Sequence, residues 1–222
     1  MNEATEVVVF DFDLTLTRWD MTDVFCRWLL KRSPWRMAMM WLSAPFLAAL
    51  LLFRRTRALP GRYAIWVATW GRDAASLPAW VDRYLDSLPG GGQAALLPQG
   101  LARVHEHLAA GQRVIIATGC IRPLVAALLH KAGLGKLPLV ASTLRPRLGG
   151  LVHAEHCYWH NKPVMLAARG FTPPWAAVYT DHHADLPLLH QAQVGYLVSP
   201  TPETLARVQK ALSSPPMVLD WR

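Results

Sequence analysis

The sequence predicts an α/β fold with a doubly wound parallel sheet, into which an all-helical segment is inserted. Four short apolar runs indicate strands, and they lie at residues 7–10, 114–117, 176–179 and 194–198. Continuous apolar runs of this length are typical of strands that are buried on both faces of a parallel sheet. Helical patterns alternate with these runs, as expected for this fold class. They cover residues 101–110, 123–132, 162–169 and 202–212.

Residues at the ends of these patterns support the assignment of the helices. Gly111, Gly133 and Gly170 directly follow three of them, and glycine is typical of the position after a helix. Thr201 precedes the fourth and is a suitable N-cap. The segment 142–153 contains two adjacent glycines between extended stretches and predicts a small hairpin.

The insert follows the first strand and is predicted to be wholly helical. Seven of the ten tryptophans lie before residue 81, and a glycine-rich stretch at 88–92 predicts a hinge. We therefore expect a catalytic core at residues 1–18 and 93–222 and a helical domain at 19–92. The helices of the insert are predicted at residues 21–32, 35–53, 62–71 and 77–88.

The composition narrows the classes of partner. The 222-residue chain carries a net charge of +8, which suits an anionic partner or substrate. No Gly-aromatic or helix-turn-helix pattern accompanies the charge, so we do not expect nucleic-acid binding. Three widely spaced cysteines argue against a disulfide framework. The polar, acidic start does not resemble a signal peptide, and we expect the catalytic domain in the cytoplasm.

Polar residues follow three of the predicted strands. Because the carboxyl ends of parallel strands share one edge of the sheet, these side chains should lie close together. Clustered carboxylates require a neutralising cation, and oxygen ligands favour Mg²⁺. Lys162, at the start of a helix, is the best candidate for a positive group facing a substrate phosphate. The residues after the strands are Asp11, Asp13, Thr118, Asp181 and Asp185.

Each of these features alone has an ordinary structural explanation, as a turn, a cap or a surface lysine. Their combination in this order indicates an active site. The motifs DFDLT, VIIATG, HNKPVML and YTDHHADLPLL together resemble the haloacid dehalogenase (HAD) superfamily of phosphatases, and the phosphoserine-phosphatase-like branch, subfamily IB, in particular. The resemblance covers the whole chain and implies a Rossmann-like core with a C1-type helical cap. Within that branch, the apolar cap resembles phosphatidylglycerophosphatase C.

The resemblance also implies the role of each residue. Asp11 corresponds to the nucleophile that forms an aspartyl-phosphate, and Asp13 to the general acid and base. Thr118 corresponds to the hydroxyl that binds the phosphoryl group, and Lys162 to the lysine that stabilises its charge. The implied Mg²⁺ ligands are Asp11, the backbone carbonyl of Asp13, and Asp181, with Asp185 in support.

Two residues depart from the family pattern. Leu14 stands where many members have glycine, and His182 stands where a small residue is frequent. The imidazole of His182 is expected to narrow the site or to contact the substrate phosphate. Neither change removes a required carboxylate.

Residues 37–53 contain no charged side chain, and every charge between residues 31 and 62 is basic. A single membrane crossing would separate Asp11 from Thr118 and Asp181, so we expect a helix dipping into one leaflet, with arginines on anionic headgroups. Burial of this helix within the protein is the alternative. Membrane contact would place the enzyme at the cytoplasmic face of the inner membrane.

Two groups of histidines remain without a firm role. The segment HAEHCYWH contains His153, His156, Cys157 and His160, which we expect to be solvated or to face the substrate, with a zinc site as the alternative. His182 and His183 are alternative acid–base groups.

The leading hypothesis is hydrolysis of phosphatidylglycerophosphate to phosphatidylglycerol, an anionic phospholipid substrate at a membrane surface. The alternatives are a soluble phosphatase acting on a phosphoserine-like metabolite, a phosphotransferase and a non-catalytic membrane scaffold. The sequence does not predict the oligomeric state.

Overall fold

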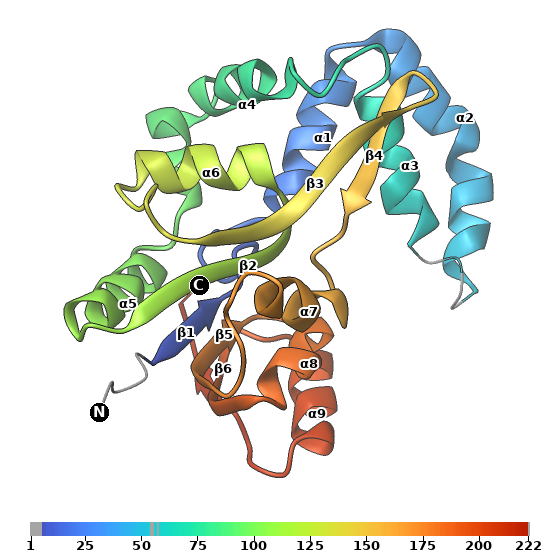
Figure 1. The fold of residues 1–222 in the computed structure, drawn as a ribbon. Helices are drawn as coiled ribbons and strands as arrows, with labels where there is room; N and C mark the ends of the chain where they lie inside the picture. The colour runs from blue at the N-terminus through green and yellow to red at the C-terminus, as the bar shows by residue number, and fades with distance from the viewer. Residues whose placement is uncertain (1–5, 54–55, 57, 222) are drawn as a thin grey trace.

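The computed structural model describes residues 6–53, 56 and 58–221, and it has the predicted α/β architecture (Figure 1). Strand β1 lies in the middle of a seven-stranded sheet of order β4-β3-β2-β1-β5-β6-β7. All neighbours pair in parallel except β3 and β4, which form the predicted hairpin. The strands are β1 (Val7–Phe10), β2 (Arg113–Ile121), β3 (Leu139–Arg147), β4 (Gly150–Glu155), β5 (Trp175–Thr180), β6 (Ala192–Val198) and β7 (Met217–Leu219).

Helices cover both faces of the sheet, as a doubly wound fold requires. Val8 and Phe10 of β1 pack with α5 and α6, whereas Val9 packs with α7, α8 and α9 on the other face. The alternation follows from the two-residue period of a strand. The helices of the core are α5 (Pro98–Ala109), α6 (Arg122–Lys131), α7 (Asn161–Ala167), α8 (Leu186–Leu189) and α9 (Pro202–Ala211).

One predicted feature of the strands is wrong in part. The apolar run at 194–198 was expected to be buried on both faces, but Val194 is 37% exposed. β6 lies near the edge of the sheet, with the short strand β7 as its outer neighbour. Val194 therefore has fewer neighbouring atoms to pack against than a residue in a central strand.

In its described residues, the insert forms the four predicted α-helices between β1 and α5, followed by a short 3-10 helix at Pro89–Ala95. Apolar residues of α1 and α4, including Phe25 and Leu85, join Leu128 of α6 in one continuous buried cluster. The chain returns through a turn in which Gly90, Gly91 and Gly92 adopt positive φ, a conformation that favours glycine. The four helices are α1 (Met21–Lys31), α2 (Pro34–Leu51), α3 (Leu59–Ala68) and α4 (Leu77–Asp86).

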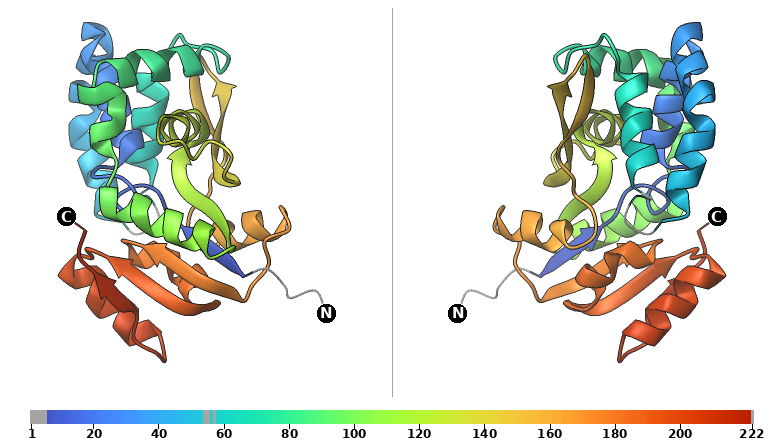
Figure 2. Two further views of the ribbon diagram at one scale, coloured as in Figure 1. Left: turned by 90° about the vertical axis from the view of Figure 1, so that its left-hand side faces the viewer. Right: turned by 90° about the vertical axis from the view of Figure 1, so that its right-hand side faces the viewer.

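The β3–β4 hairpin extends beyond the sheet and lies beside α3 (Figures 1 and 2). Trp66 Nε1 of α3 donates a hydrogen bond of 3.0 Å to the carbonyl of Arg147. A Cβ atom on Gly150 would lie only 2.5 Å from the carbonyl oxygen of Trp66. The hairpin and the helices are therefore packed backbone to backbone.

Helix α2 is unusual because none of its residues is buried. Trp41 is 73% exposed, Leu42 83% and Phe46 67%. Met37 and Met40 lie on the side that packs against the core cluster. Among the described residues, no helix combines the length and apolar character needed to cross a membrane. Three of the arginines that were expected to contact anionic headgroups lie outside the described residues: Arg54, Arg55 and Arg57.

Arg32 and Arg36, at the start of α2, contact groups within the insert. Arg36 donates to the carbonyl of Trp70, and burial lowers its pKa. Arg32 lies over the ring of Trp28, 3.5 Å from its centroid. Aromatic rings and carbonyls within the insert therefore hold both guanidinium groups.

Candidate active site

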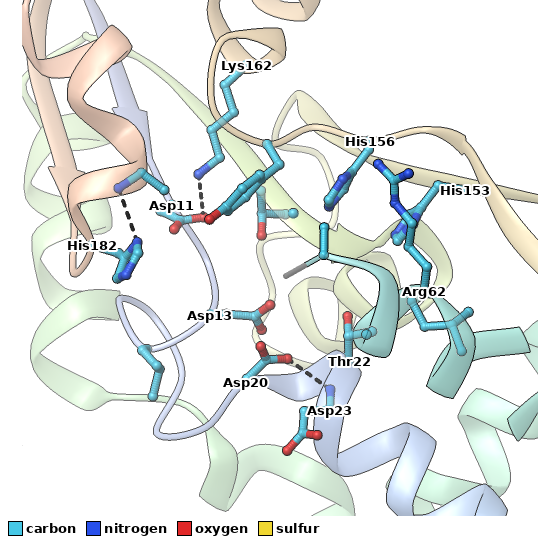
Figure 3. Close-up of a pocket in the computed structure, with 18 of the residues that line it drawn as sticks. Asp11, Asp13, Asp20, Thr22, Asp23, Arg62, His153, His156, Lys162 and His182 are labelled. Carbon is cyan, nitrogen blue, oxygen red and sulfur yellow. Dashed lines mark hydrogen bonds and ion pairs between the residues drawn. The ribbon is translucent and has the colours of Figure 1, made fainter. Parts of the chain in front are cut away.

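A cavity of about 580 Å³ opens between the carboxyl ends of the central strands and helices α1 and α3. The turn after β1, the end of β2, the start of α7 and the loop after β5 meet there (Figure 3). All six site residues predicted from the sequence line this cavity: Asp11, Asp13, Thr118, Lys162, Asp181 and Asp185.

Lys162 is the centre of a buried ion-pair network. Its Nζ lies 3.0 Å from Asp11 Oδ1 and 2.7 Å from Asp185 Oδ2. The hydroxyl of Thr180 donates to the same Asp185 oxygen at 2.8 Å. The other oxygen, Asp185 Oδ1, is buried and has no hydrogen-bond partner. Burial alone would lower the pKa of Lys162. The charges of Asp11 and Asp185 outweigh this effect and raise the pKa above its ordinary value, so the lysine stays charged.

Asp11 follows β1, and its own backbone amide donates to the carbonyl of Tyr179 on β5 at 2.9 Å. Burial raises the pKa of the Asp11 carboxyl to about 7; Lys162 opposes this, and Asp185 and Asp181 add to it. The backbone amide of Phe12 donates to Asp11 Oδ1 at 2.8 Å. The carboxylate is therefore fixed in place but lies in a field with excess negative charge.

Asp13 faces the first helix of the insert. Its Oδ1 accepts a hydrogen bond of 2.9 Å from the backbone amide of Met21, at the start of α1. Burial raises the pKa of Asp13 well above its ordinary value, and the nearby charge of Asp20 raises it further. Both effects favour the protonated form of the carboxyl.

The turn between Asp11 and α1 brings the two aspartates to one cavity. The amides of Leu16 and Thr17 both donate to the carbonyl of Phe12. Leu14 adopts a φ of 58°, in the left-handed region that favours glycine. The departure from the family pattern at this position therefore falls on a residue in a strained backbone conformation.

Thr118 is fully buried near the carboxyl end of β2. Its Oγ1 accepts a hydrogen bond of 3.0 Å from the amide of Cys120. The strand continues to Ile121, with a register shift against β3 after Thr118. The hydroxyl proton of Thr118 is thus free to turn toward a phosphate oxygen in the cavity.

The donor chemistry of the cavity fits a Mg²⁺ ion. In the described part of the chain, six aspartates line the cavity, against one lysine and one arginine. No three His, Cys, Asp or Glu side chains of the described residues are gathered as a complete metal site. Mg²⁺ takes one or two carboxylates and fills its other positions with water and substrate oxygens. Asp11, Asp181 and the carbonyl of Asp13 are the groups that would hold it.

Among the cavity residues that the sequence reasoning did not assign to the site are Asp20, Thr22 and Arg62. Asp20 is the N-cap of α1, and its side chain accepts from the amide of Asp23 at 2.8 Å. Thr22 donates to Cys120 Sγ at 3.2 Å, and Arg62 enters from α3. An aspartate directly before a predicted helix was a visible capping signal, but its nearness to Asp13 depends on how the insert packs.

The structure separates the predicted groups of histidines. His182 lines the cavity, where its Nδ1 accepts from the amide of Ala184, whereas His183 turns toward Arg207. Of the HAEHCYWH segment, His153 and His156 line the cavity. These two histidines therefore face the cavity. Cys157 and His160 are not cavity residues: Cys157 is buried against the carbonyl of Val140, and His160 packs against Trp159.

Comparisons with solved structures find the same fold. A protein of unknown function from Bordetella pertussis Tohama I is 21% identical, with a TM-score of 0.72; the match covers 99% of this chain and 100% of that one. A phosphoserine phosphohydrolase-like protein from Francisella tularensis subsp. tularensis SCHU S4 is 17% identical, with a TM-score of 0.59, and 96% and 94% are covered. A phospho-aspartyl intermediate analogue of phosphoserine phosphatase is 13% identical, with a TM-score of 0.56 and coverage of 97% and 93%.

The family model for haloacid dehalogenase-like hydrolases matches residues 8–190. This range contains all six predicted site residues and the whole insert. The predicted HAD-type enzyme class is confirmed, and the neighbouring structures share its fold. The chain is a member of the haloacid dehalogenase-like hydrolase family.

Proposed function

We propose that this protein is a Mg²⁺-dependent phosphatase that hydrolyses phosphomonoesters through an aspartyl-phosphate on Asp11. The observation that carries the proposal is the buried network in which Lys162 bridges Asp11 and Asp185. The network holds the Asp11 carboxylate, at the wall of the cavity, beside a fixed positive charge, which suits attack on an anionic phosphate. The phospho-aspartyl form of the related phosphoserine phosphatase supports the same intermediate.

In the first step, a carboxylate oxygen of Asp11 attacks phosphorus and the bond to the leaving oxygen breaks. Asp13, whose raised pKa favours the protonated form, gives its proton to that oxygen. Lys162 and the Thr118 hydroxyl stabilise the charge on the phosphoryl oxygens. In the second step, Asp13 takes a proton from water, which attacks phosphorus and releases inorganic phosphate. A bound Mg²⁺ would neutralise negative charge on the phosphate and on Asp11.

The test is phosphate release from p-nitrophenyl phosphate with Mg²⁺ or EDTA. Asp11→Asn should lower kcat by about a thousandfold or more, as expected when a nucleophile is removed. Asp82→Asn, on the exposed surface of α4, is the matched control and should keep full activity. Activity that survives both EDTA and Asp11→Asn would disprove the mechanism.

We further propose that residues 19–92 act as a substrate-selecting cap and that its apolar helix α2 rests on a membrane. The support is the exposure of Trp41, Leu42 and Phe46 on a helix without a charged residue between 37 and 53. Aromatic and aliphatic side chains of this kind enter the interface of a bilayer. Phosphatidylglycerophosphate is then the leading substrate, cleaved at the cytoplasmic face of the cell membrane.

Sedimentation with vesicles tests the membrane contact. Wild type should bind vesicles of which about one third of the lipid is anionic phosphatidylglycerol. The double variant Trp41→Ser with Phe46→Ser should bind them about tenfold or more weakly. Leu148→Ser, which removes an exposed leucine from the hairpin turn, is the control. Equal binding by all three proteins would exclude α2 as the contact.

A phosphoserine-like metabolite is the second candidate substrate, because two of the fold neighbours described above are phosphoserine-phosphatase-like. The values of kcat/KM for phosphoserine and for phosphatidylglycerophosphate in mixed micelles separate the two candidates. Preference for the soluble ester would leave the mechanism intact and reject the lipid substrate.

A further inference from the structure

One group of basic side chains in the cavity has no part in the proposed chemistry. Arg62 comes from α3, His153 from β4, and His156 from the loop that follows it. Figure 3 shows the three side chains together, away from Asp11 and Lys162 and on the side of the cavity formed by α3. The rings of His153 and His156 are stacked, with centroids 4.2 Å apart. We refer to these three residues as the basic cluster.

The hydrogen-bonding groups of the basic cluster are unused. Within the described part of the chain, no hydrogen bond engages a ring nitrogen of His153 or His156, and no carboxylate pairs with Arg62. Nδ1 of His153 is shielded from solvent without a partner. Buried polar groups are usually hydrogen-bonded, and those left unpaired destabilise the protein. Nδ1 of His153 is such a group, and it faces the same cavity as His156 and the exposed Arg62. Together the three side chains indicate a ligand that accepts hydrogen bonds.

The charges around the cluster favour an anion. Burial lowers the pKa of His156 to about 4, and His153, Arg62 and Lys162 lower it further. Burial and Arg62 lower the pKa of His153 in the same direction. A neutral imidazole still has one N–H donor, and Arg62 supplies a permanent positive charge. The local field is thus positive at this side of a cavity whose other side is acidic.

We propose that Arg62, His153 and His156 bind a second anionic group on the leaving part of the substrate. The inference rests on the proposed phosphatase activity, because the reacting phosphate would occupy the place beside Asp11 and Lys162. Besides Arg62, α3 and its N-cap residue present Ala58, Gly61, Ala64 and Ile65 to the cavity, of which only Ile65 is large. Nothing lies within 4 Å of a Cβ added to Gly61. The small side chains leave room for a linker such as a glycerol unit.

The ligand is an oxyanion, and two kinds of substrate carry one at this distance from a phosphomonoester. One is a phosphodiester, as in the headgroup of a phosphorylated glycerophospholipid. The other is a carboxylate, as in a small phosphorylated acid. Both accept hydrogen bonds from a guanidinium group and imidazole N–H groups.

The test compares kcat/KM for three water-soluble esters, so that membrane binding does not enter. Besides its phosphomonoester, glycerophosphoglycerophosphate carries one phosphodiester and 3-phosphoglycerate carries a carboxylate, whereas glycerol 3-phosphate carries neither. Arg62→Gln and His156→Phe, which keeps the ring stack, should each lower kcat/KM about 10- to 100-fold for one of the first two, mainly through KM. The loss on glycerol 3-phosphate should stay within about twofold, and Arg62→Lys should lie in between.

Arg103→Gln and His105→Phe, on the surface of α5, are the matched controls and should change none of the three values. The ester that loses activity identifies the anion as phosphodiester or carboxylate. A uniform loss on all three esters, or no loss on any, would overturn the proposal.

If wild type hydrolyses none of the esters, the proposed function fails, and calorimetric titration of Asp11→Asn with glycerophosphoglycerophosphate and 3-phosphoglycerate then decides the inference. Binding of either that Arg62→Gln weakens about tenfold or more supports the second anion site. The second anion site is overturned if Asp11→Asn binds the two compounds equally well with and without Arg62→Gln, or if neither protein binds them.

Discussion

At the scale of single residues, the turn after β1 shows how the site strains its own backbone. Leu14 has a φ of 58°, where its Cβ meets the neighbouring carbonyl oxygen. The chain keeps this conformation because the amides of the turn converge on Phe12 and because Asp13 is fixed by the amide of Met21.

Replacing Leu14 by glycine should therefore stabilise the protein. The relief of left-handed strain, about 1–2 kcal/mol, outweighs the loss of about 0.5–1 kcal/mol from the greater freedom of glycine in the unfolded chain. Urea unfolding should show a net gain of roughly 0.5–1 kcal/mol. Ala102→Gly, at an exposed position in the interior of α5, should instead destabilise by about 1 kcal/mol. A loss of stability in Leu14→Gly would show that side-chain packing outweighs the strain.

Asp20 lies close enough to Asp13 for its charge to affect the proposed general acid. Burial is the main cause of the raised pKa of Asp13, and Asp20 is the next. Asp20→Asn removes a negative charge, so the pKa of Asp13 falls and its proton is lost at lower pH. The alkaline limb of kcat/KM against pH should move toward lower pH. Asp86→Asn, on the surface beside Lys131, should leave the profile unchanged, and an unmoved limb in Asp20→Asn would contradict the assignment of Asp13.

At the scale of elements, the starts of the helices were the least well predicted. The predicted helices at 101–110 and 62–71 begin in the structure at Pro98 and Leu59. Both true starts have proline at the first or second position, where its missing N–H is not needed. The signal was present in the sequence, but the apolar periodicity that guided the prediction begins one turn later.

The contact between the hairpin and α3 gives a test at this scale. A Cβ on Gly150 would lie 2.5 Å from a backbone oxygen of Trp66, which cannot move without shifting α3. Gly150→Ala should therefore destabilise the protein by about 1–3 kcal/mol. Gly61→Ala has open space around its Cβ and lies in a helix, so it should stabilise by about 0.5–1 kcal/mol. Thermal unfolding of both variants checks the pair, and equal effects would show that the hairpin is not packed tightly on the insert.

At the scale of the whole molecule, the aspartates of the cavity link stability to pH and to metal. The carboxyl of Asp11 titrates near 3.8 when unfolded and at about 7 in the folded protein, because of burial and its acidic neighbours. Between these values the folded state binds more protons, so this group's contribution to stability is complete below about pH 4 and is lost as pH rises through 7. Asp13 and Asp20, whose pKa values burial also raises, act in the same direction.

Mg²⁺ should reverse this loss, since it binds the deprotonated carboxylates. The rise in Tm on adding Mg²⁺ should be small at pH 5 and grow toward pH 8. At a concentration of 100 times Kd, the gain is about 2.7 kcal/mol. Asp11→Asn should largely lose the effect and its pH dependence, whereas Asp82→Asn should keep both. A shift in Tm that is equal at pH 5 and pH 8 would place the ion away from Asp11.

The sequence alone was sufficient to predict the α/β fold, the helical insert and the residues at the ends of β1, β2 and β5. It was sufficient because strand residues alternate faces and because parallel strands deliver their carboxyl ends to one edge of the sheet. Thr118 and the aspartates after these strands line the cavity as the motif order indicated.

Only the tertiary structure showed which residues of the insert meet that edge. Asp20 lies beside Asp13, and Arg62 lies beside His153 and His156, because α1, α3 and the hairpin pack against one another at one end of the molecule. The packing of these elements depends on the fit of many side chains that are distant in sequence, and no local sequence pattern predicts it. The exposure of α2 also depends on the tertiary structure. An apolar helix has the same sequence pattern whether the fold buries it or leaves it exposed.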